Sequence, residues 1–495
     1  MSKLIIQNGN MCELDLPLKF AQKLYNEFAI RHPNAFYLRT RQRGMQNWDG
    51  KIHYITKTGQ FKIGLLPKVY DMCIEMGIKP KVVDMRQPLP KVSKVVTNIG
   101  KYKLRPEQEK AVKAVINNKI GNTPFHIGVL DYTVNAGKTL IMSSLYLSYK
   151  KQLKTLLITN DSDWLNQARE EFKQYLPGED ITFVQGKVLN WSNFTIGMVQ
   201  SISRNMRFYQ KELSQIDMVL IDEADQGGSK QYQNVITRLF NTRIRIGLSG
   251  TIYMSKLAKD RVKNMNLECF FGKVLAEFKL KDSIKKGYST KTVVKMVPGK
   301  PWYGNWESDC ISYKEIYDDS ITNCYTAWLM AYNRLLWNLN QGRYPALVVC
   351  KHIAHCENLY KFFKKKLGDA YNIAYVHVNT PSKLRQQIMK DFREGKIDIL
   401  VSTTIIARGK NFPKLKYLLN TASMDSQEKS IQFLGRLVRT DESKNKVYLD
   451  DLHYPGNYLD RHGKHRKQYY QRQELKVILL DKLWKKHPNH SLIKS

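Results

Sequence analysis

A short segment after an apolar run carries residue types that bind phosphate groups. Residues 133–139 read TVNAGKT and follow the apolar run 127–132. Backbone N–H groups at the start of a helix attract phosphate oxygens, and the pattern Gly-x-x-x-x-Gly-Lys-Ser/Thr adds a lysine and a hydroxyl group. Tyr132 stands at the first glycine position, so the strict pattern is not met. The predicted triphosphate-binding residues are Thr133, Val134, Asn135, Ala136, Gly137, Lys138, which would reach the β- and γ-phosphates, and Thr139, which would coordinate Mg²⁺.

Two adjacent carboxylates end a second apolar run. Residues 218–225 read MVLIDEAD. Asp222 fits a residue that holds Mg²⁺, directly or through water, and Glu223 fits one that polarises an attacking water. A polar loop entry after a buried strand would explain either motif alone. The order and spacing of the two motifs favour a site that hydrolyses ATP with Mg²⁺.

A third motif lies far downstream, where residues 432–439 read QFLGRLVR. On a helix, Gln432, Arg436 and Arg439 would project from one face at positions i, i+4 and i+7. Two arginines on one face could reach a γ-phosphate from a second domain. A solvated basic helix face is the alternative, but the Gly-Arg pair after an apolar run favours a catalytic role.

The elements that must position these residues form two series. The apolar runs are residues 127–132, 155–160, 194–200, 218–224 and 245–250, and then 346–351, 374–378, 398–403, 417–422 and 447–452. Helical patterns separate the runs, which predicts an α/β protein with two doubly wound parallel sheets. The first lobe would span residues 102–285 and the second 286–460. A long, aromatic-rich helix is expected within residues 313–340.

Residues 1–90 are predicted to form a small α+β domain, followed by a linker at 91–101. Residues 35–42 and 50–58 read as strands between two helices. On a strand, alternate residues face one side, so Arg39, Arg41 and Arg43 could bind phosphates together. Trp48 could stack on an unpaired base or fill a small core.

The net charge of +36 calls for a polyanionic partner, nucleic acid first and an anionic membrane surface second. No apolar run is long enough for a membrane helix and the N-terminus is not a signal peptide, so we expect a cytoplasmic protein. The basic segment 461–495 could be a helix that contacts DNA through Tyr469, Tyr470 and Trp484, or a solvated one.

Cysteine usage indicates a reducing compartment. The chain has seven cysteines and no Cys-x-x-Cys pair, which disfavours a disulfide framework or a zinc ribbon. One cluster, Cys350-x-His352-x-x-His355-Cys356, has ligand-like spacing. Tight spacing alone is weak support for a metal site.

Together these motifs resemble those of the superfamily 2 helicases, over nearly everything after Lys101. The resemblance implies two RecA-like lobes. Residues 102–108 (YKLRPEQ) resemble the adenine-reading motif, with Gln108 as the base reader. Ser249, Gly250 and Thr251 resemble motif III, which couples hydrolysis to strand movement. Residues 402–411 (STTIIARGKN) resemble motif V, with Gly409 at the nucleotide, although Lys410-Asn411 departs from the usual Gly-x-Asp.

The same resemblance implies nucleic-acid contacts on motifs Ia (156–167), Ib (195–201), IV (348–352) and V. The implied contacting residues are Gln200, Ser201, Lys351, Thr403 and Thr404. Residues 222–225 spell DEAD, but DEAD-box RNA helicases pair this with SAT in motif III and HRIGRxxR in motif VI. This chain has SGT and QFLGRLVR instead, so it looks more like the DNA-directed branch.

Residues 36–55 and 64–77 are similar to the N-terminal domain of the phage UvsW-type helicases, and so is the KHxxH of motif IV. The DNA-binding residues predicted in this region are Arg39, Arg41, Arg43, Trp48 and Lys51. The similarity implies an ATP-dependent motor on branched DNA that migrates junctions, reverses forks and unwinds R-loops in phage recombination, repair and replication. We further expect a monomer in the host cytoplasm, possible replication or recombination partners, and no metal at the Cys/His cluster.

Three alternatives stay open. An RNA helicase fits, because the motifs of the motor core do not distinguish DNA from RNA. The motor part of a restriction or repair complex fits if a partner cleaves, because no nuclease constellation is visible. A DNA-annealing protein with an inactive ATP site is the non-enzymatic alternative, and Lys138, Asp222, Glu223 and Arg436 together argue against it.

Overall fold

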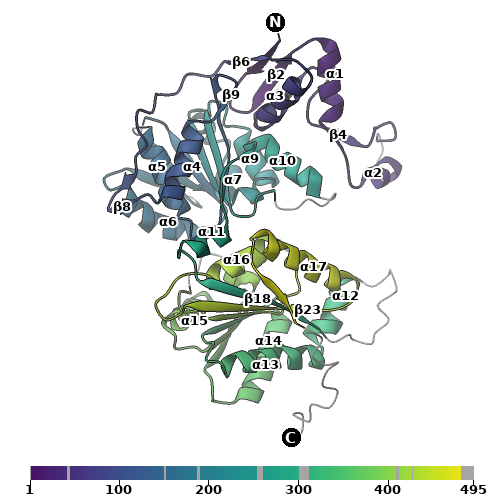
Figure 1. Cartoon of the computed structure of the whole chain (residues 1–495), viewed down its shortest axis with the longest axis vertical. Coiled ribbons are helices and arrows are strands. Elements are labelled where there is room, and N and C mark those ends of the chain that lie inside the picture. The colour runs from purple at the N-terminus through teal and green to yellow at the C-terminus, as the bar shows by residue number, and fades with distance from the viewer. Residues whose placement is uncertain are drawn as a thin grey trace. The chain divides into compact units, whose positions relative to one another are not determined.

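The computed structural model describes residues 2–41, 45–149, 152–186, 190–253, 260–299, 312–407, 412–425 and 427–480. The chain divides into two compact units, Met1–Phe278 and Lys279–Ser495 (Figure 1). Among the helices in the described ranges, none is long and apolar enough to cross a membrane.

The described residues of the first unit contain a seven-stranded parallel sheet with the order β13-β14-β12-β15-β16-β11-β17. All residues of the five inner strands are buried, and the five apolar runs predicted these strands correctly. The two edge strands, β13 and β17, are partly exposed, so their mixed sequences carried no such signal. The strands are β11 (His126–Tyr132), β12 (Thr155–Thr159), β13 (Ile181–Val184), β14 (Phe194–Met198), β15 (Met218–Asp222), β16 (Ile244–Ser249) and β17 (Val274–Phe278).

Helices lie on both sides of this sheet (Figure 1). On one side α5 packs against α4 and α6, and on the other α7 packs against α9. Two small hairpins, β7–β8 (Asn98–Ile99, Tyr102–Lys103) and β9–β10 (Lys119–Ile120, Thr123–Pro124), flank α4 in sequence. The helices are α4 (Pro106–Ile116), α5 (Lys138–Ser148), α6 (Ser162–Tyr175), α7 (Val199–Arg204), α8 (Gln210–Ser214), α9 (Lys230–Ile236) and α10 (Arg261–Phe271).

The N-terminal region, residues 2–90, has its own sheet with the order β5-β2-β1-β6. Strands β1 (Lys3–Ile6), β2 (Met11–Asp15), β5 (Gln60–Lys62) and β6 (Lys81–Asp84) are accompanied by the predicted helices, α1 (Leu18–Glu27) and α3 (Leu66–Glu75). Strand β6 pairs in parallel with β1, so the proline-containing stretch after α3 begins as a strand. The later residue Val96 donates its N–H to Ser148 Oγ at 3.0 Å, which holds the connecting segment against α5.

One prediction in this region is wrong, because residues 35–41 form helix α2 (Ala35–Arg41) rather than a strand. Strands β3 (Ala29–Arg31) and β4 (Lys51–His53) pair with each other, so the residues between them have no strand partner. A helix satisfies their backbone groups locally. Successive alternate residues on a helix diverge, so Arg39 and Arg41 do not share a face. Arg43 lies outside the described residues.

The N-terminal region is joined to the first unit's large sheet by buried polar contacts. The Gly9 N–H donates to the Phe240 carbonyl at 2.6 Å. The Arg245 guanidinium on β16 donates to Gly9 O and to Asn10 Oδ1, both at 2.7 Å, and to Phe270 O at 3.2 Å. Arg245 is fully buried, and burial, followed by the nearby Arg86, lowers its pKa to about 9. The two sheets therefore form one body.

The described residues of the second unit contain another seven-stranded parallel sheet, with the order β20-β21-β19-β22-β23-β18-β24. The sequence correctly predicted β19–β23 but missed β18, in which Lys291 and Lys295 interrupt the apolar pattern, and the edge strand β24. The strands are β18 (Lys291–Pro298), β19 (Ala346–Cys350), β20 (Ile373–Val376), β21 (Ile399–Thr403), β22 (Tyr417–Asn420), β23 (Lys446–His453) and β24 (Val477–Leu479).

The long aromatic helix predicted within residues 313–340 is interrupted. Helix α12 (Tyr313–Tyr317) continues into a π-helical turn, Asp318–Thr322, and α13 (Tyr325–Leu339) begins after it. The other helices of this unit are α11 (Leu280–Lys285), α14 (Ile353–Leu367), α15 (Ser382–Glu394), α16 (Gln427–Leu437) and α17 (Asn457–Arg472).

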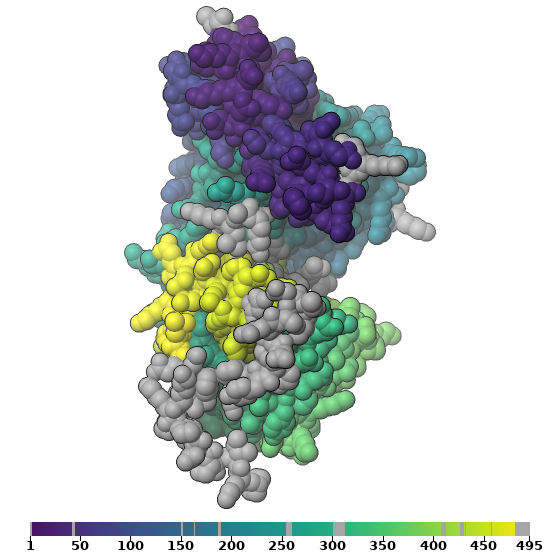
Figure 2. Space-filling view, turned by 90° about the vertical axis from the view of Figure 1, so that its right-hand side faces the viewer, coloured from purple at the N-terminus to yellow at the C-terminus, as the bar shows by residue number. Residues whose placement is uncertain are grey.

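The described part of the basic C-terminal segment belongs to the second unit's core. Helix α17 packs against α16 and β23, and this segment is the yellow surface of Figure 2. Arg466 is fully buried and pairs with Asp451 at 2.9 Å, and the Tyr470 hydroxyl donates to the same carboxylate at 2.7 Å. Tyr469 and Tyr470 are buried, so neither is an exposed DNA contact. Trp484 lies outside the described residues.

Candidate nucleotide-binding site and nucleic-acid interface

The predicted phosphate-binding loop connects β11 to α5, whose first residue is Lys138. Asn135 and Gly137 both have positive φ, 63° and 71°. Left-handed residues of this kind are typical of loops whose backbone N–H groups form an anion-binding concavity. A Cβ on Gly137 would lie 2.3 Å from Gln108 Nε2. Only glycine therefore fits this position without displacing its neighbour.

Two side chains of the preceding segment hold the loop in place. Gln108 Nε2 donates to the Ala136 carbonyl at 2.9 Å, and Arg105 Nη2 donates to the Asn135 carbonyl at 3.1 Å. Gln108 Oε1 accepts from the Arg105 N–H, and its side chain is almost fully buried. Gln108 thus supports the loop, and its role as base reader stays a prediction.

The acidic motif lies at the end of β15. Asp222 is buried, and burial raises its pKa, while the charge of Lys138 opposes this rise. Its Oδ1 atom is buried and has no hydrogen-bond partner among the described residues. A buried carboxylate oxygen of this kind needs a cation or a donor. With the Thr139 hydroxyl at the start of α5, the donor set fits Mg²⁺, which prefers oxygen ligands.

Glu223 follows directly and has an unusual backbone, with φ of 51°. Burial raises its pKa to about 8, and the charges of Asp222, Asp225 and Asp161 add to the rise while Lys138 opposes it. A carboxylate with a pKa near neutrality is suited to accept a proton from water.

Motif III connects the acidic motif with the phosphate-binding loop. Ser249 Oγ donates to Asp225 Oδ1 at 2.6 Å and lies 3.0 Å from Thr251 Oγ1. A Cβ on Gly250 would lie 3.0 Å from Thr133 Cα. The three segments meet because β15, β16 and β11 are neighbours in a parallel sheet, so their carboxyl ends share one edge.

Asp225 and Asp161 were missed as site residues by the sequence analysis. Asp225 was visible as the last residue of the DEAD string, and Asp161 as an acid two residues after the end of β12. Each follows a buried parallel strand, which is the signal that could have identified them.

The other motif residues of the first unit lie beside this edge. Gln200 and Ser201 are on α7, which starts at the carboxyl end of β14. Gln200 Nε2 donates to the Asn160 carbonyl at 3.3 Å, and Ser201 Oγ accepts from the Gly186 N–H at 2.9 Å. Both side chains are half-buried. A nucleic-acid role for them stays a prediction.

In the second unit, the motif residues again follow neighbouring strands. Lys351 comes directly after β19, and its Nζ lies 3.9 Å from the ring centroid of Tyr313. Thr403 is the last residue of β21 and Thr404 begins a 3₁₀ turn, Thr404–Ala407. Since β21 and β19 are paired, these three residues lie at one edge. Gly409 falls outside the described residues.

The arginine motif is only partly helical. Gln432 and Arg436 lie on α16, but this helix ends at Leu437. Arg439 therefore does not project from the helix face, contrary to the prediction. Its carbonyl accepts from Thr290 Oγ1 at 3.1 Å, which ties the end of the motif to the start of β18.

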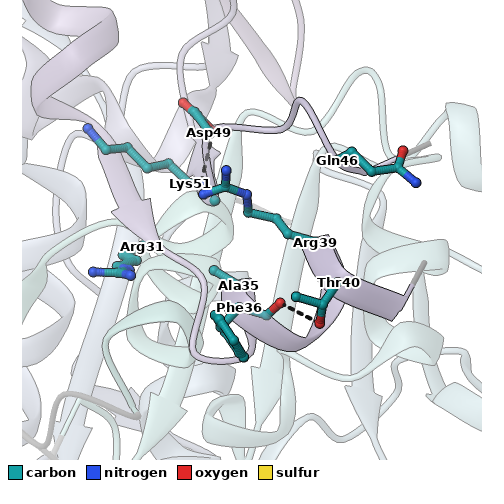
Figure 3. A pocket seen from close by; sticks show the side chains of 9 residues that line it. Arg31, Ala35, Phe36, Arg39, Thr40, Gln46, Asp49 and Lys51 are labelled. Atoms are coloured by element: carbon teal, nitrogen blue, oxygen red, sulfur yellow. Dashed lines mark hydrogen bonds between the residues drawn. The ribbon is translucent and has the colours of Figure 1, made fainter. Parts of the chain in front are cut away.

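The N-terminal region contains an open, basic cavity of about 470 Å³. Figure 3 shows Arg39 extending from α2 toward Asp49 and Lys51, with Arg31 opposite. The side chain of Phe36 also lines the cavity and is 80% exposed. Three cations against one carboxylate suit a phosphate-bearing ligand. Arg41 does not line this cavity and lies over the Tyr37 ring at 5.1 Å.

Trp48 matches neither alternative fully, because it is not a core residue and is not fully exposed for stacking on a base. Its Nε1 donates to the Lys51 carbonyl at 2.9 Å, and its ring packs edge-on against His32. The side chain is half-buried. It therefore supports the turn that carries Lys51.

The Cys/His cluster is part of the second unit's core. His355 is fully buried, and burial lowers its pKa to about 3, while its Nδ1 pairs with the Tyr317 hydroxyl at 3.0 Å. Cys350 and Cys356 are also buried. No metal-ligand group of three or more His, Cys, Asp or Glu residues occurs in the described ranges.

Sequence families match both units. The family described as Type III restriction enzyme, res subunit, matches residues 101–254, and the helicase conserved C-terminal domain matches residues 329–441. A protein named as helicase 22 of Sulfolobus islandicus filamentous virus is 22% identical over 71% of this chain and 64% of its own length. The Saccharomyces cerevisiae protein named as ATP-dependent helicase IRC3 is 23% identical over 70% of this chain and 51% of its own length. The chain thus spans about half to two thirds of these relatives.

Solved structures share the fold. The Type ISP restriction-modification enzyme LlaBIII, solved bound to DNA, has a TM-score of 0.57 and 13% identity over 83% of this chain and 34% of that one. The crystal structure of UvsW of phage T4 aligns with 97% of this chain and with 98% of the UvsW chain, with a TM-score of 0.44 and 19% identity. The UvsW-type assignment stays a prediction. The two family matches, the helicase relatives and the two parallel-sheet units together place the chain in the superfamily 2 helicases.

Proposed function

We propose that this protein is an ATP-dependent DNA helicase or translocase that acts on branched DNA. One observation carries the proposal: the ends of β11, β15 and β16 bring Lys138, Asp222 and Glu223 to one edge of a parallel sheet. The Ser249–Asp225 hydrogen bond joins this group to motif III. These are the residue types that phosphoryl transfer to water requires.

The residues have separable roles in the proposed reaction. The loop backbone and Lys138 bind the triphosphate, and Asp222 with Thr139 would hold Mg²⁺, which neutralises phosphate charge. Glu223 orients the attacking water and accepts its proton, for which its raised pKa is suited. In the second unit, Arg436 and Arg439 stabilise charge on the transferred phosphoryl group and Gln432 contributes a polar side chain. Gly409 is assigned to the nucleotide on the family resemblance alone.

DNA as the substrate is supported by charge and by the N-terminal cavity. The chain carries a net charge of +36, and Arg31, Arg39 and Lys51 concentrate positive charge at one opening. Motifs Ib, IV and V, with Gln200, Ser201, Lys351, Thr403 and Thr404, would grip one strand, while the N-terminal region holds a duplex arm. Roles in phage recombination, repair and replication, a monomeric state and a cytoplasmic location belong to the same proposal.

The test is ATPase activity with single-stranded DNA, duplex, fork, four-way junction, R-loop and RNA. We expect the largest stimulation with forks or junctions, and none in Lys138→Ala. Stimulation by RNA but not DNA would favour an RNA helicase. Undiminished unwinding by Lys138→Ala would overturn the motor mechanism. Strand annealing without any ATP-dependent unwinding in the unmodified protein would favour an annealing protein.

The N-terminal role is best tested with point variants. Removing residues 1–90 would leave the buried Arg245 without its Gly9 and Asn10 acceptors, and so would disturb the motor itself. Arg39→Gln with Lys51→Gln removes two charges from the cavity, and Lys19→Gln with Lys23→Gln on α1 removes two exposed charges elsewhere. We expect only the first pair to reduce the preference for branched over linear DNA.

A further inference from the structure

A second basic surface lies in the second unit, outside every motif assigned above. It surrounds Trp337, a residue near the end of α13 that is 42% exposed. Lys295 Nζ, Arg334 Cζ and Arg343 Cζ lie 4.8, 5.0 and 4.8 Å from the centroid of that ring. Arg343 also lies 3.6 Å from the Tyr448 centroid, and Lys446 Nζ lies 5.7 Å from it. We call Lys295, Arg334, Trp337, Arg343, Lys446 and Tyr448 the Trp337 patch.

The positive charge of this patch is largely uncompensated. Asp450 is the nearest acid, but Arg334 binds it at 2.5 Å, and Tyr417 and Asn338 also donate to it. In the described part of the chain, no carboxylate lies within ion-pair distance of Lys295, Arg343 or Lys446. Burial lowers the pKa of Lys295, Asp450 opposes this shift, and Arg334, Arg343 and Lys446 add to it. Like charges held this close together favour an anionic ligand.

The aromatic rings fix the orientation of the cations. A guanidinium that lies face-on to a ring keeps its N–H groups in the plane, where they can bind phosphate oxygens. Arg343 Cζ lies 3.6 Å from the Tyr448 centroid, and one of the Arg343 amino groups donates to Asn338 Oδ1 at 2.8 Å, which further fixes the side chain. The exposed part of Trp337 offers an apolar surface for a sugar or a base.

The patch is separate from the motif residues of the same unit. Lys446 is the first residue of β23, and Arg343 lies just before β19. These positions are at the amino ends of parallel strands, whereas Lys351, Thr403 and Thr404 lie at the carboxyl ends. A strand bound by the motif residues therefore does not account for the Trp337 patch.

We propose that the Trp337 patch binds the phosphate backbone of a second segment of the DNA substrate, apart from the strand that the motor motifs grip. This inference rests on the proposed function, because a motor on branched DNA meets more than one arm. Binding at the Trp337 patch would also give a role to part of the positive charge that lies outside the motor site.

The experiment compares two variants of the full-length protein that lose the same charge. Lys295→Gln with Lys446→Gln removes two cations from the patch, and Lys365→Gln with Lys366→Gln removes two exposed cations from the last turn of α14. Binding of a fluorescent four-way junction is measured by anisotropy at several salt concentrations. We expect the patch variant alone to bind about 3- to 10-fold more weakly and to lower the slope of log K against log salt by about 1–2.

The outcomes separate this inference from the proposed function. Equal affinity and slope for the patch and control variants would overturn the inference. Loss of ATPase stimulation by short single-stranded DNA in the patch variant would also overturn it, because the patch would then belong to the motor track. If the unmodified protein binds no DNA, the proposed function itself fails. If the double variant folds poorly, Arg343→Gln repeats the test, because this substitution changes no residue of strands β18 and β23.

Discussion

The Ser249 hydroxyl donates a hydrogen bond of 2.6 Å to the Asp225 carboxylate. This bond joins the end of β16 to the turn that follows β15, and Gly250 next to it contacts the start of the phosphate-binding loop. A change at the nucleotide can therefore reach motif III through two direct contacts.

Replacing Ser249 by alanine should separate hydrolysis from strand movement. The variant leaves Lys138, Asp222 and Glu223 in place but removes a bond to a charged acceptor, worth about 1.5–3 kcal/mol. We expect ATP affinity within about 2-fold of the unmodified protein and much less DNA unwound per ATP hydrolysed. Ser249→Thr keeps the hydroxyl and should restore the coupling; equal unwinding per ATP in the alanine variant would contradict this role.

Glu223 should make the protein less stable as the pH rises. Its folded pKa of about 8 lies above its ordinary value of 4.5, so the folded state binds more protons than the unfolded state between these values. Stability then falls with rising pH across this window and levels off above pH 8.

Glu223→Gln should remove this loss of stability. We expect equal free energies of unfolding near pH 4.5 and a more stable variant at pH 9, by on the order of a few kcal/mol. Urea unfolding at pH 5, 7 and 9 measures the difference. Glu170→Gln, at an exposed position of α6, is the control and should follow the unmodified protein. Parallel pH profiles for Glu223→Gln and the unmodified protein would contradict the raised pKa.

Gly9→Ala should loosen the N-terminal region. The added Cβ would lie 2.5, 2.8 and 2.9 Å from the carbonyl oxygens of Leu239, Thr242 and Phe240, and backbone atoms cannot move aside easily. We expect a loss of about 1–3 kcal/mol and faster proteolysis between residues 85 and 101. Gly228→Ala, whose nearest atom would be 3.7 Å away on Leu267, serves as the matched control. Identical thermal midpoints would show that the two sheets are not held by this contact.

Gln108→Ala distinguishes two roles of this side chain. If Gln108 supports the phosphate-binding loop through Ala136, affinity for ATP and GTP should fall equally, by about 2- to 10-fold. If it reads the adenine base, affinity for ATP alone should fall and discrimination against GTP should disappear. Binding of fluorescent ATP and GTP analogues decides between these outcomes. We expect the equal loss.

The strand pattern was largely readable from the sequence, because buried parallel strands contain little but apolar residues. The five inner strands of the first sheet and strands β19–β23 of the second appear as apolar runs. Edge strands such as β13, and β18 with its two lysines, lack that signal. Residues 35–41 were predicted as a strand, because arginines at alternate positions occur both on strands and on exposed helices. The pairing of β3 with β4 leaves these residues without a strand partner, which favours the helix.

For the site, the local sequence identifies the chemistry, because Lys138 and Thr139 follow one predicted strand and Asp222 and Glu223 follow another. The residues that surround these side chains become known only from the folded chain. Strand order places motif III between the two motifs, buries Asp225 against Ser249, and turns Gln108 onto the loop. Such contacts join residues far apart in sequence, and their geometry depends on sheet order and packing, which local patterns do not encode.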